Sequence, residues 1–122
     1  MKFTLPIFAL ILLLTGCSNT PSDAELRQKV QGTWMPYHDS RKTTEHKADG
    51  SFVFKFTLEL TNEMTAEGTW QIKDGFMVTT ITNASWPDAK LEVNRYKIVH
   101  IDDHEMILRH DGATNLLKVL KK

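Results

Sequence analysis

From Gly32 to the C-terminus, apolar and polar residues alternate with a period of two, which is typical of β-strands. The alternation is clearest over residues 51–60. One face of this segment carries only apolar side chains, which are Phe52, Phe54, Phe56, Leu58 and Leu60. Because successive side chains in a strand point to opposite faces, we expect this face to lie against a hydrophobic core. The pattern predicts an all-β domain.

Three Asp-Gly pairs, at residues 49–50, 74–75 and 111–112, are turn signals of the hairpin type. Together with the alternation they divide the chain into eight short predicted strands, at residues 33–38, 43–47, 51–60, 67–73, 76–82, 91–101, 105–110 and 115–121. Short strands joined by tight turns predict an antiparallel up-and-down meander. An open sheet of this kind has two exposed edges, so we expect it to close into a small barrel or half-barrel.

A short helix is predicted before the first strand. Ser22-Asp23-Ala24-Glu25 fits a capping box, in which the serine accepts from the backbone of the glutamate. The helix then covers about residues 23–30. Its apolar positions are few, so we expect it to cover part of the sheet rather than to form a core by itself.

The first 17 residues have a different character. Lys2 precedes the apolar run 6–14, and Leu14-Thr15-Gly16 leads to Cys17, the one cysteine of the sequence. This segment resembles a bacterial lipoprotein signal peptide with its lipobox. The run is shorter than the roughly 20 apolar residues that span a bilayer, which argues against a transmembrane helix. By this resemblance, Cys17 carries acyl chains such as palmitate.

The resemblance implies three parts: a signal peptide at residues 1–16 that is removed, a lipidated cysteine with a short tether at 17–21, and a single domain at 22–122. At about 3.5 Å per residue, the tether holds the domain within ~20 Å of the membrane. Ser18 follows the cysteine. By resemblance to the sorting rule of enterobacterial lipoproteins, a serine there implies the outer membrane of the cell envelope.

Charge and cysteine content exclude several other classes of protein. The chain has 15 basic and 15 acidic residues, a balance that does not favour nucleic acid as a partner. A single cysteine allows no disulfide within the chain, so stability must come from packing. Three tryptophans and six phenylalanines are consistent with a real hydrophobic core.

A tripeptide recurs at the start of two predicted strands, as Gly32-Thr33-Trp34 and as Gly68-Thr69-Trp70. The first copy directly follows the short helix, and this arrangement resembles the lipocalins and the small bacterial lipocalin-like lipoproteins. The resemblance implies that Trp34 closes the floor of a barrel under a basic side chain, for which Arg109 is the candidate. It also implies a binding site for a small apolar or amphipathic ligand inside the barrel.

An eight-stranded barrel is either filled by side chains or just wide enough for one small ligand. If it is hollow, we expect the lining to include Trp34, Phe54, Phe56, Trp70 and Trp86. Trp86 lies in the longest break between predicted strands, where it could be a lid, a plug or an anchor for a partner. If the barrel is solid, the protein is instead an interaction module, such as an inhibitor or assembly accessory, that grips an envelope protein through loops or an edge strand.

Catalysis is not expected. A hydrolase needs a nucleophile with a base and an orienting acid, and the sequence has no Gly-x-Ser-x-Gly. Cys17 is assigned to lipid, and no pair of carboxylates has an apolar setting that would raise a pKa. No cofactor is predicted.

The histidines suggest two weak metal hypotheses. The first groups His100, Asp102 and His104, with His110 further along, because alternate residues of a strand share a face. The second groups His38-Asp39 with His46 near the rim of the barrel. Both stretches read better as polar loops with ordinary surface histidines, so we expect no metal site.

Overall fold

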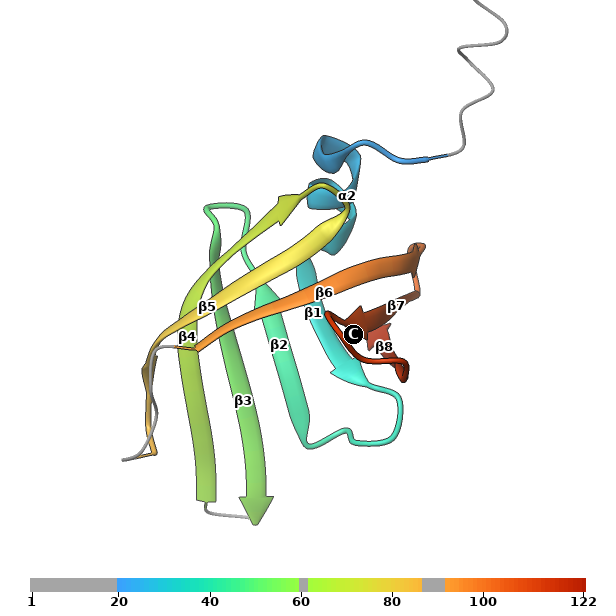
Figure 1. Cartoon of the computed structure of the whole chain (residues 1–122). Helices are drawn as coiled ribbons and strands as arrows, with labels where there is room; N and C mark the ends of the chain where they lie inside the picture. The colour runs from blue at the N-terminus through green and yellow to red at the C-terminus, as the bar shows by residue number, and fades with distance from the viewer. Residues whose placement is uncertain (1–19, 60–61, 87–91) are drawn as a thin grey trace, which may run out of the picture.

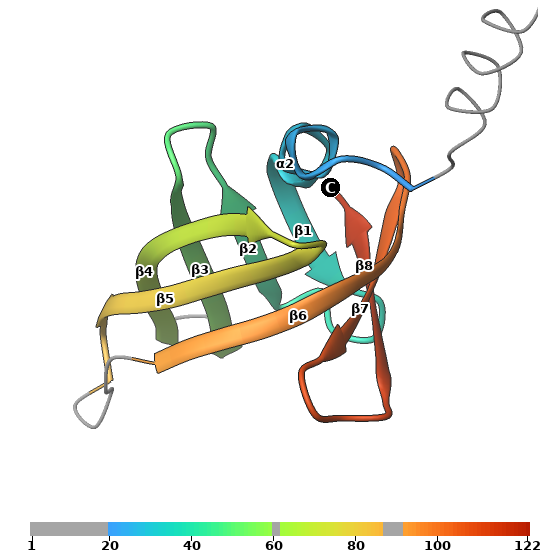
Figure 2. The same cartoon turned by 45° about the horizontal axis from the view of Figure 1, so that its top comes forward.

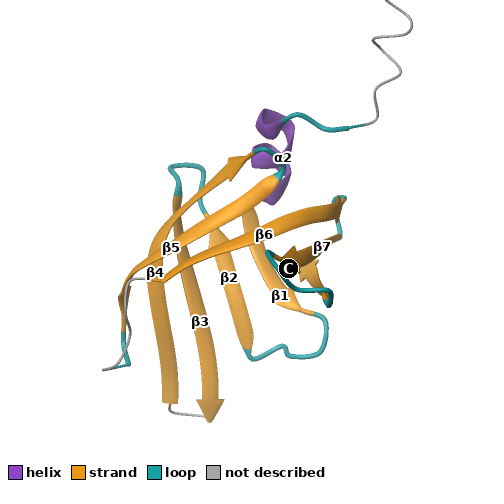
Figure 3. Ribbon diagram, in the orientation of Figure 1, coloured by secondary structure: helices purple, strands orange, loops and turns teal. Residues whose placement is uncertain are grey.

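The computed structural model describes residues 20–59, 62–86 and 92–122. Eight antiparallel strands follow one another around a closed barrel, and the last strand pairs with the first (Figures 1 and 3). The strands are β1 (Gly32–Pro36), β2 (Lys42–His46), β3 (Ser51–Glu59), β4 (Asn62–Lys73), β5 (Phe76–Ala84), β6 (Glu92–Ile101), β7 (Glu105–His110) and β8 (Leu116–Lys121). The predicted all-β meander and its closure are confirmed. Cys17 and its predicted lipidation lie outside the described residues.

The strands agree with the prediction except at β4, which begins at Asn62 and not at residue 67. Residues 62–66 carry little apolar alternation, so the sequence alone does not mark them as a strand. They are extended because they pair with the second half of β3, from Phe54 opposite Ala66 to Glu59 opposite Asn62. Pairing with β3 therefore makes residues 62–66 part of β4, although their own sequence does not predict a strand.

Helix α2 (Asp23–Val30) has the predicted bounds, and it begins as predicted, with the Ser22 hydroxyl accepting from the Glu25 amide at 3.2 Å. Two of its apolar side chains, Leu26 and Val30, are buried in the core of the barrel. The helix lies across one end of the barrel, beside the β2–β3 and β4–β5 turns (Figures 1 and 2). This end is called the closed end below.

The carboxylate of Asp23 fixes the helix to the sheet. It accepts hydrogen bonds from the backbone amides of Asp74 and Gly75, at 2.9 and 3.0 Å, in the β4–β5 turn. Such charge-assisted bonds are stronger than neutral ones.

The opposite end of the barrel, called the open end, carries the β1–β2 loop and the β7–β8 loop (Figure 1).

The two copies of Gly-Thr-Trp need glycine for different reasons. Gly32 has a φ of +124°, which side-chain-bearing residues rarely adopt. Gly68 lies at a β-bulge next to Glu67, where the backbone of β5 comes very close. A Cβ at Gly68 would lie 1.8 Å from the carbonyl oxygen of Thr80 and 2.9 Å from the ring of Phe52.

Within the described residues, the buried core and all strand pairs lie between Asp23 and Lys121. In the part of the chain that the structure describes, no helix is long and apolar enough to cross a bilayer.

Candidate functional site

The barrel is hollow. A cavity of about 500 Å³ runs from the closed end toward the open end, and every strand except β4 lines it within the described residues. Its apolar lining consists of Trp34, Pro36, Phe52, Phe54, Met77, Ile81, Trp86, Met106, Leu108, Leu117 and Val119. Its polar lining consists of Lys42, Thr44, His46, Thr79, Asn94 and Tyr96. An apolar interior with a few polar groups is typical of a small-molecule site.

Three of the five predicted lining residues, Trp34, Phe54 and Trp86, do line the cavity. Trp34 lies at the closed end and is buried, whereas Trp86 is half-buried and follows β5 at the open end. Phe54 lies between them on β3, paired with Ala66 on one side and Thr44 on the other. The cavity therefore has an aromatic side chain at its floor, its wall and its mouth.

Trp70 is not part of the lining, although it is almost fully buried. It comes from β4, and its ring packs edge-on against His46 with ring centroids 5.3 Å apart. Its indole N–H donates to the carbonyl of Lys47 at 2.9 Å, and the Arg27 guanidinium lies 4.7 Å from its centre. The second Gly-Thr-Trp thus closes the end of the barrel behind His46.

Phe56 also lies outside the lining. It follows Phe54 by two positions on β3 and pairs with Lys42 near the open end. The charged groups of Arg41 and Lys42 lie 5.4 and 5.1 Å from its ring. Phe56 therefore makes cation–π contacts at the rim of the barrel. Phe54 and Phe56 have the same place in the apolar alternation, so the sequence pattern could not show that only Phe54 lines the cavity.

Trp34 has the predicted position at the floor, but its basic neighbour is Lys121 and not Arg109. The Lys121 ammonium lies 5.4 Å from the indole, because Lys121 pairs directly with Trp34 across β1 and β8. Arg109 lies on β7, where it pairs with Lys97 and Leu116. The prediction was wrong because it placed the basic residue one strand too early.

His46 lines the cavity, although it was not among the predicted lining residues. It lies at the end of β2, opposite Phe52, and its side chain is only 3% exposed. Neither ring nitrogen has a hydrogen-bond partner within the described residues. Burial lowers the pKa of His46 from 6.5 to about 4, so the imidazole is neutral at pH 7.

The turn signal in the sequence pointed the other way. A two-residue hairpin with Asp49-Gly50 at its centre would pair His46 with Val53, whereas the structure pairs His46 with Phe52 and so places it on the face of the aromatic row. The hypothesis that joined His46 to His38 near the rim was wrong. His38 lies in the loop at the open end of the barrel, whereas His46 is at the closed end of β2.

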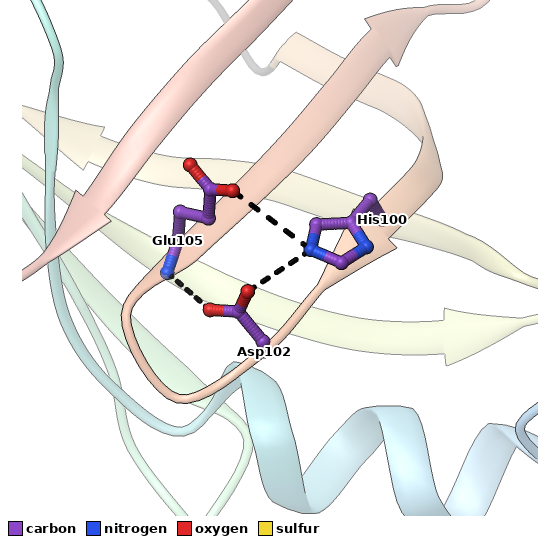
Figure 4. Close-up of side chains that lie close together, drawn as sticks. All are labelled: His100, Asp102 and Glu105. Carbon is purple, nitrogen blue, oxygen red and sulfur yellow. Dashed lines mark hydrogen bonds and ion pairs between the residues drawn. The ribbon is translucent and has the colours of Figure 1, made fainter.

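A second cluster lies at the β6–β7 turn, where His100, Asp102 and Glu105 converge (Figure 4). His100 Nε2 is 3.0 Å from Asp102 Oδ2 and 3.9 Å from Glu105 Oε1. Of the residues in the first metal hypothesis, His104 contributes only its backbone amide to this cluster and His110 is not part of it. Glu105 forms an ion pair with Lys118 at 3.0 Å.

The carboxylate of Asp102 is already used by hydrogen bonds within this turn. The backbone amides of His104 and Glu105 donate to Asp102, and these bonds, followed by the one to His100, lower the pKa of Asp102 to about 2. The carboxylate thus holds the turn in the way that an aspartate commonly does. The side chains are substantially exposed, so this cluster does not resemble an enclosed metal site.

The barrel matches a known architecture. Among solved structures, a lipocalin-like protein from Bacteroides uniformis, determined at 1.79 Å, matches with a TM-score of 0.60 and 13% identity, over 77% of this chain and 98% of that one. The fold is lipocalin-like. The sequence matches no protein-family model and no curated protein. The low identity limits the likeness to the fold, so function has to be argued from the cavity.

Proposed function

We propose that this protein is a non-catalytic binding protein that holds a small apolar or amphipathic molecule inside its barrel. The observation that carries the proposal is the cavity of about 500 Å³. This volume falls within the roughly 300–1,000 Å³ typical of small-molecule sites. Burial of an apolar ligand there removes its surface from water, which contributes about 25 cal/mol per Å².

The alternative, a solid-cored interaction module, has less support. It requires inward side chains, such as Phe52, Phe54, Phe56, Trp70 and Ile72, to fill the barrel. The interior is hollow, and each described strand pairs with two neighbours, so the described barrel offers no edge strand for a partner. An envelope protein could then be gripped only through loops.

We propose further that the barrel is held at the outer membrane through acyl chains on Cys17. The lipobox-like sequence and Ser18 support this assignment. The described chain enters the barrel through α2 at the closed end (Figure 1). Trp86 follows β5 at the opposite end. A short tether would therefore hold the mouth of the cavity on the side away from its attachment, where a ligand can enter from the aqueous phase.

Native mass spectrometry of residues 18–122, purified from the native host, tests the binding function. We expect a discrete extra mass that is lost on denaturation. A bare mass, combined with no thermal shift across a panel of lipids and haem, would overturn the proposal.

A matched pair of variants locates the ligand. Phe54→Ala removes a ring from the cavity wall, whereas Phe56→Ala removes a ring of the same strand that lies outside the cavity. We expect Phe54→Ala to weaken binding of the retained molecule at least tenfold and Phe56→Ala to change it less than twofold. Equal effects of the two would place the ligand elsewhere.

A further inference from the structure

The floor of the cavity contains a polar group without a partner. Both ring nitrogens of His46 are shielded from solvent, and no described residue donates to them or accepts from them. A neutral imidazole has one N–H donor and one acceptor nitrogen, and leaving both unpaired in a buried site costs free energy. Native proteins seldom leave such groups unsatisfied without a functional reason.

The surroundings of His46 explain why the protein does not supply the partner. Phe52 lies directly opposite in the sheet, Trp70 packs edge-on against the ring, and Gly32 pairs on the other side. Both nearby indole N–H groups are already used, by the carbonyls of Val30 and Lys47. His46 lines the cavity, so a molecule in the cavity is the remaining source of a partner once a rotation of the ring turns a nitrogen toward it.

We propose that His46 is the hydrogen-bonding anchor at the floor of the cavity, and that the bound molecule is amphipathic, with an uncharged hydroxyl or carbonyl group that enters first. This inference rests on the proposed function and adds the chemistry and orientation of the ligand. A hydroxyl can donate to the acceptor nitrogen of the imidazole, and a carbonyl can accept from its N–H.

The rest of the cavity fixes the orientation of the apolar part. On β2 the lining changes from His46 at the floor through Thr44 to Lys42 near the mouth, and Phe54 faces the middle of this path. The half-buried ring of Trp86 lies at the open end. A hydrocarbon group attached to the polar head therefore extends along Phe54 toward Trp86.

The charge of the head group follows from the electrostatics of the floor. Two cations at this end of the barrel, Arg27 and Lys121, lie against the rings of Trp70 and Trp34. The imidazole itself is neutral at pH 7 because burial lowers the pKa of His46. A charged head group would lose its hydration without gaining a direct ion pair with His46, which is unfavourable in an apolar site.

Calorimetric titration of residues 18–122 with two probes, n-octanol and n-butylbenzene, tests the inference. The first has a hydroxyl and the second is apolar throughout. We expect His46→Leu to weaken n-octanol binding about tenfold and to change n-butylbenzene binding less than twofold. Thr43→Val is the matched control, since it removes a hydroxyl from the same strand at a position outside the cavity lining, and it should leave both affinities within twofold.

A second measurement does not depend on a folded variant. In the wild-type protein, the ring nitrogen resonances of His46 should shift on addition of n-octanol and stay in place with n-butylbenzene. His46→Gln, which keeps a donor and an acceptor, should restore most of the n-octanol affinity lost in His46→Leu.

The outcomes separate the two proposals. If both probes bind and neither His46→Leu nor the nitrogen resonances respond to the hydroxyl, the cavity is a binding site and His46 is not its anchor. If Thr44→Val, which removes a hydroxyl from the cavity lining, alone weakens n-octanol binding, the head group sits higher in the barrel and the inference is overturned. If haemin binds with a shifted Soret band and His46→Leu abolishes that shift, His46 is a ligand of haem iron, and the inference of a hydroxyl or carbonyl partner is overturned. Failure of both probes to bind would overturn the proposed function as well.

Discussion

The indole N–H of Trp34 donates to the carbonyl oxygen of Val30 at 2.7 Å, and both residues are almost fully buried. This bond joins the first strand of the barrel to the last turn of α2, where helix carbonyls have no partner within the helix. This buried hydrogen bond therefore adds to the apolar contacts of Leu26 and Val30 in holding the helix to the floor of the cavity.

Trp34→Phe removes this contact while keeping an aromatic ring. We expect the free energy of unfolding to fall by about 2 kcal/mol, because the Val30 carbonyl is left buried without its partner and the smaller ring packs less well. Urea denaturation with an unchanged m-value measures this loss. Trp86→Phe, at the half-buried mouth, is the control and should cost less than about 0.5 kcal/mol. Equal losses in the two variants would contradict the assigned role of Trp34.

His46 makes stability depend on pH. Its pKa is about 4 in the folded protein and 6.5 when unperturbed, so the unfolded chain binds the proton first as the pH falls. Stability is fully present above pH 6.5 and is lost progressively down to about pH 4, by about 3 kcal/mol in total. Chemical denaturation across this range should show the loss in the wild-type protein and a smaller one in His46→Leu. An unchanged slope in the variant would rule out His46 as the source.

Gly68 and Gly75 form a contrasting pair of glycines. In Gly68→Ala the added methyl group meets the Thr80 carbonyl and the Phe52 ring, so the bulge between β4 and β5 must shift. In Gly75→Ala the methyl group meets nothing within 4 Å, and only the positive φ of 79° is unfavourable. We expect losses of about 3 kcal/mol and about 1 kcal/mol in thermal or urea unfolding. The reverse order would contradict the close approach at Gly68.

Asp23 and Glu25 both place a carboxylate in the first turn of α2, but the Asp23 side chain accepts two bonds from the β4–β5 turn. Asp23→Ala should reduce the free energy of unfolding by about 1–2 kcal/mol and speed hydrogen exchange at the Gly75 amide. Glu25→Ala removes a similar favourable interaction with the helix dipole and serves as the control, with a loss below about 0.5 kcal/mol. Unchanged exchange at Gly75 in Asp23→Ala would show that the helix is held by its apolar side chains alone.

Much of the architecture could be read from the sequence because it depends on local signals. The capping box gave the bounds of α2, and the Asp-Gly turns gave the order of the strands. Closure of the barrel followed from the need to pair both edges of the sheet. The first half of β4 was missed because its extension depends on pairing with β3, which local pattern does not record.

The site was only partly predictable. Trp34, Phe54 and Trp86 line the cavity as expected, but Phe56 and Trp70 share the same periodicity and lie outside it. The lining residues differ from Phe56 and Trp70 in their depth along the barrel axis. A period-two pattern gives the face of the sheet on which a side chain lies and not its height in the barrel.

The amino-acid sequence by itself determined the strands, the turns, the helix and the direction of the aromatic face, since these depend on residues close together in the chain. Only the tertiary structure decided that the barrel is hollow, that Lys121 covers Trp34, and that His46 is buried without a hydrogen-bond partner among the described residues. Each of these depends on which side chains meet across strands distant in sequence. The volume left between them is a property of their packing, which no single strand encodes.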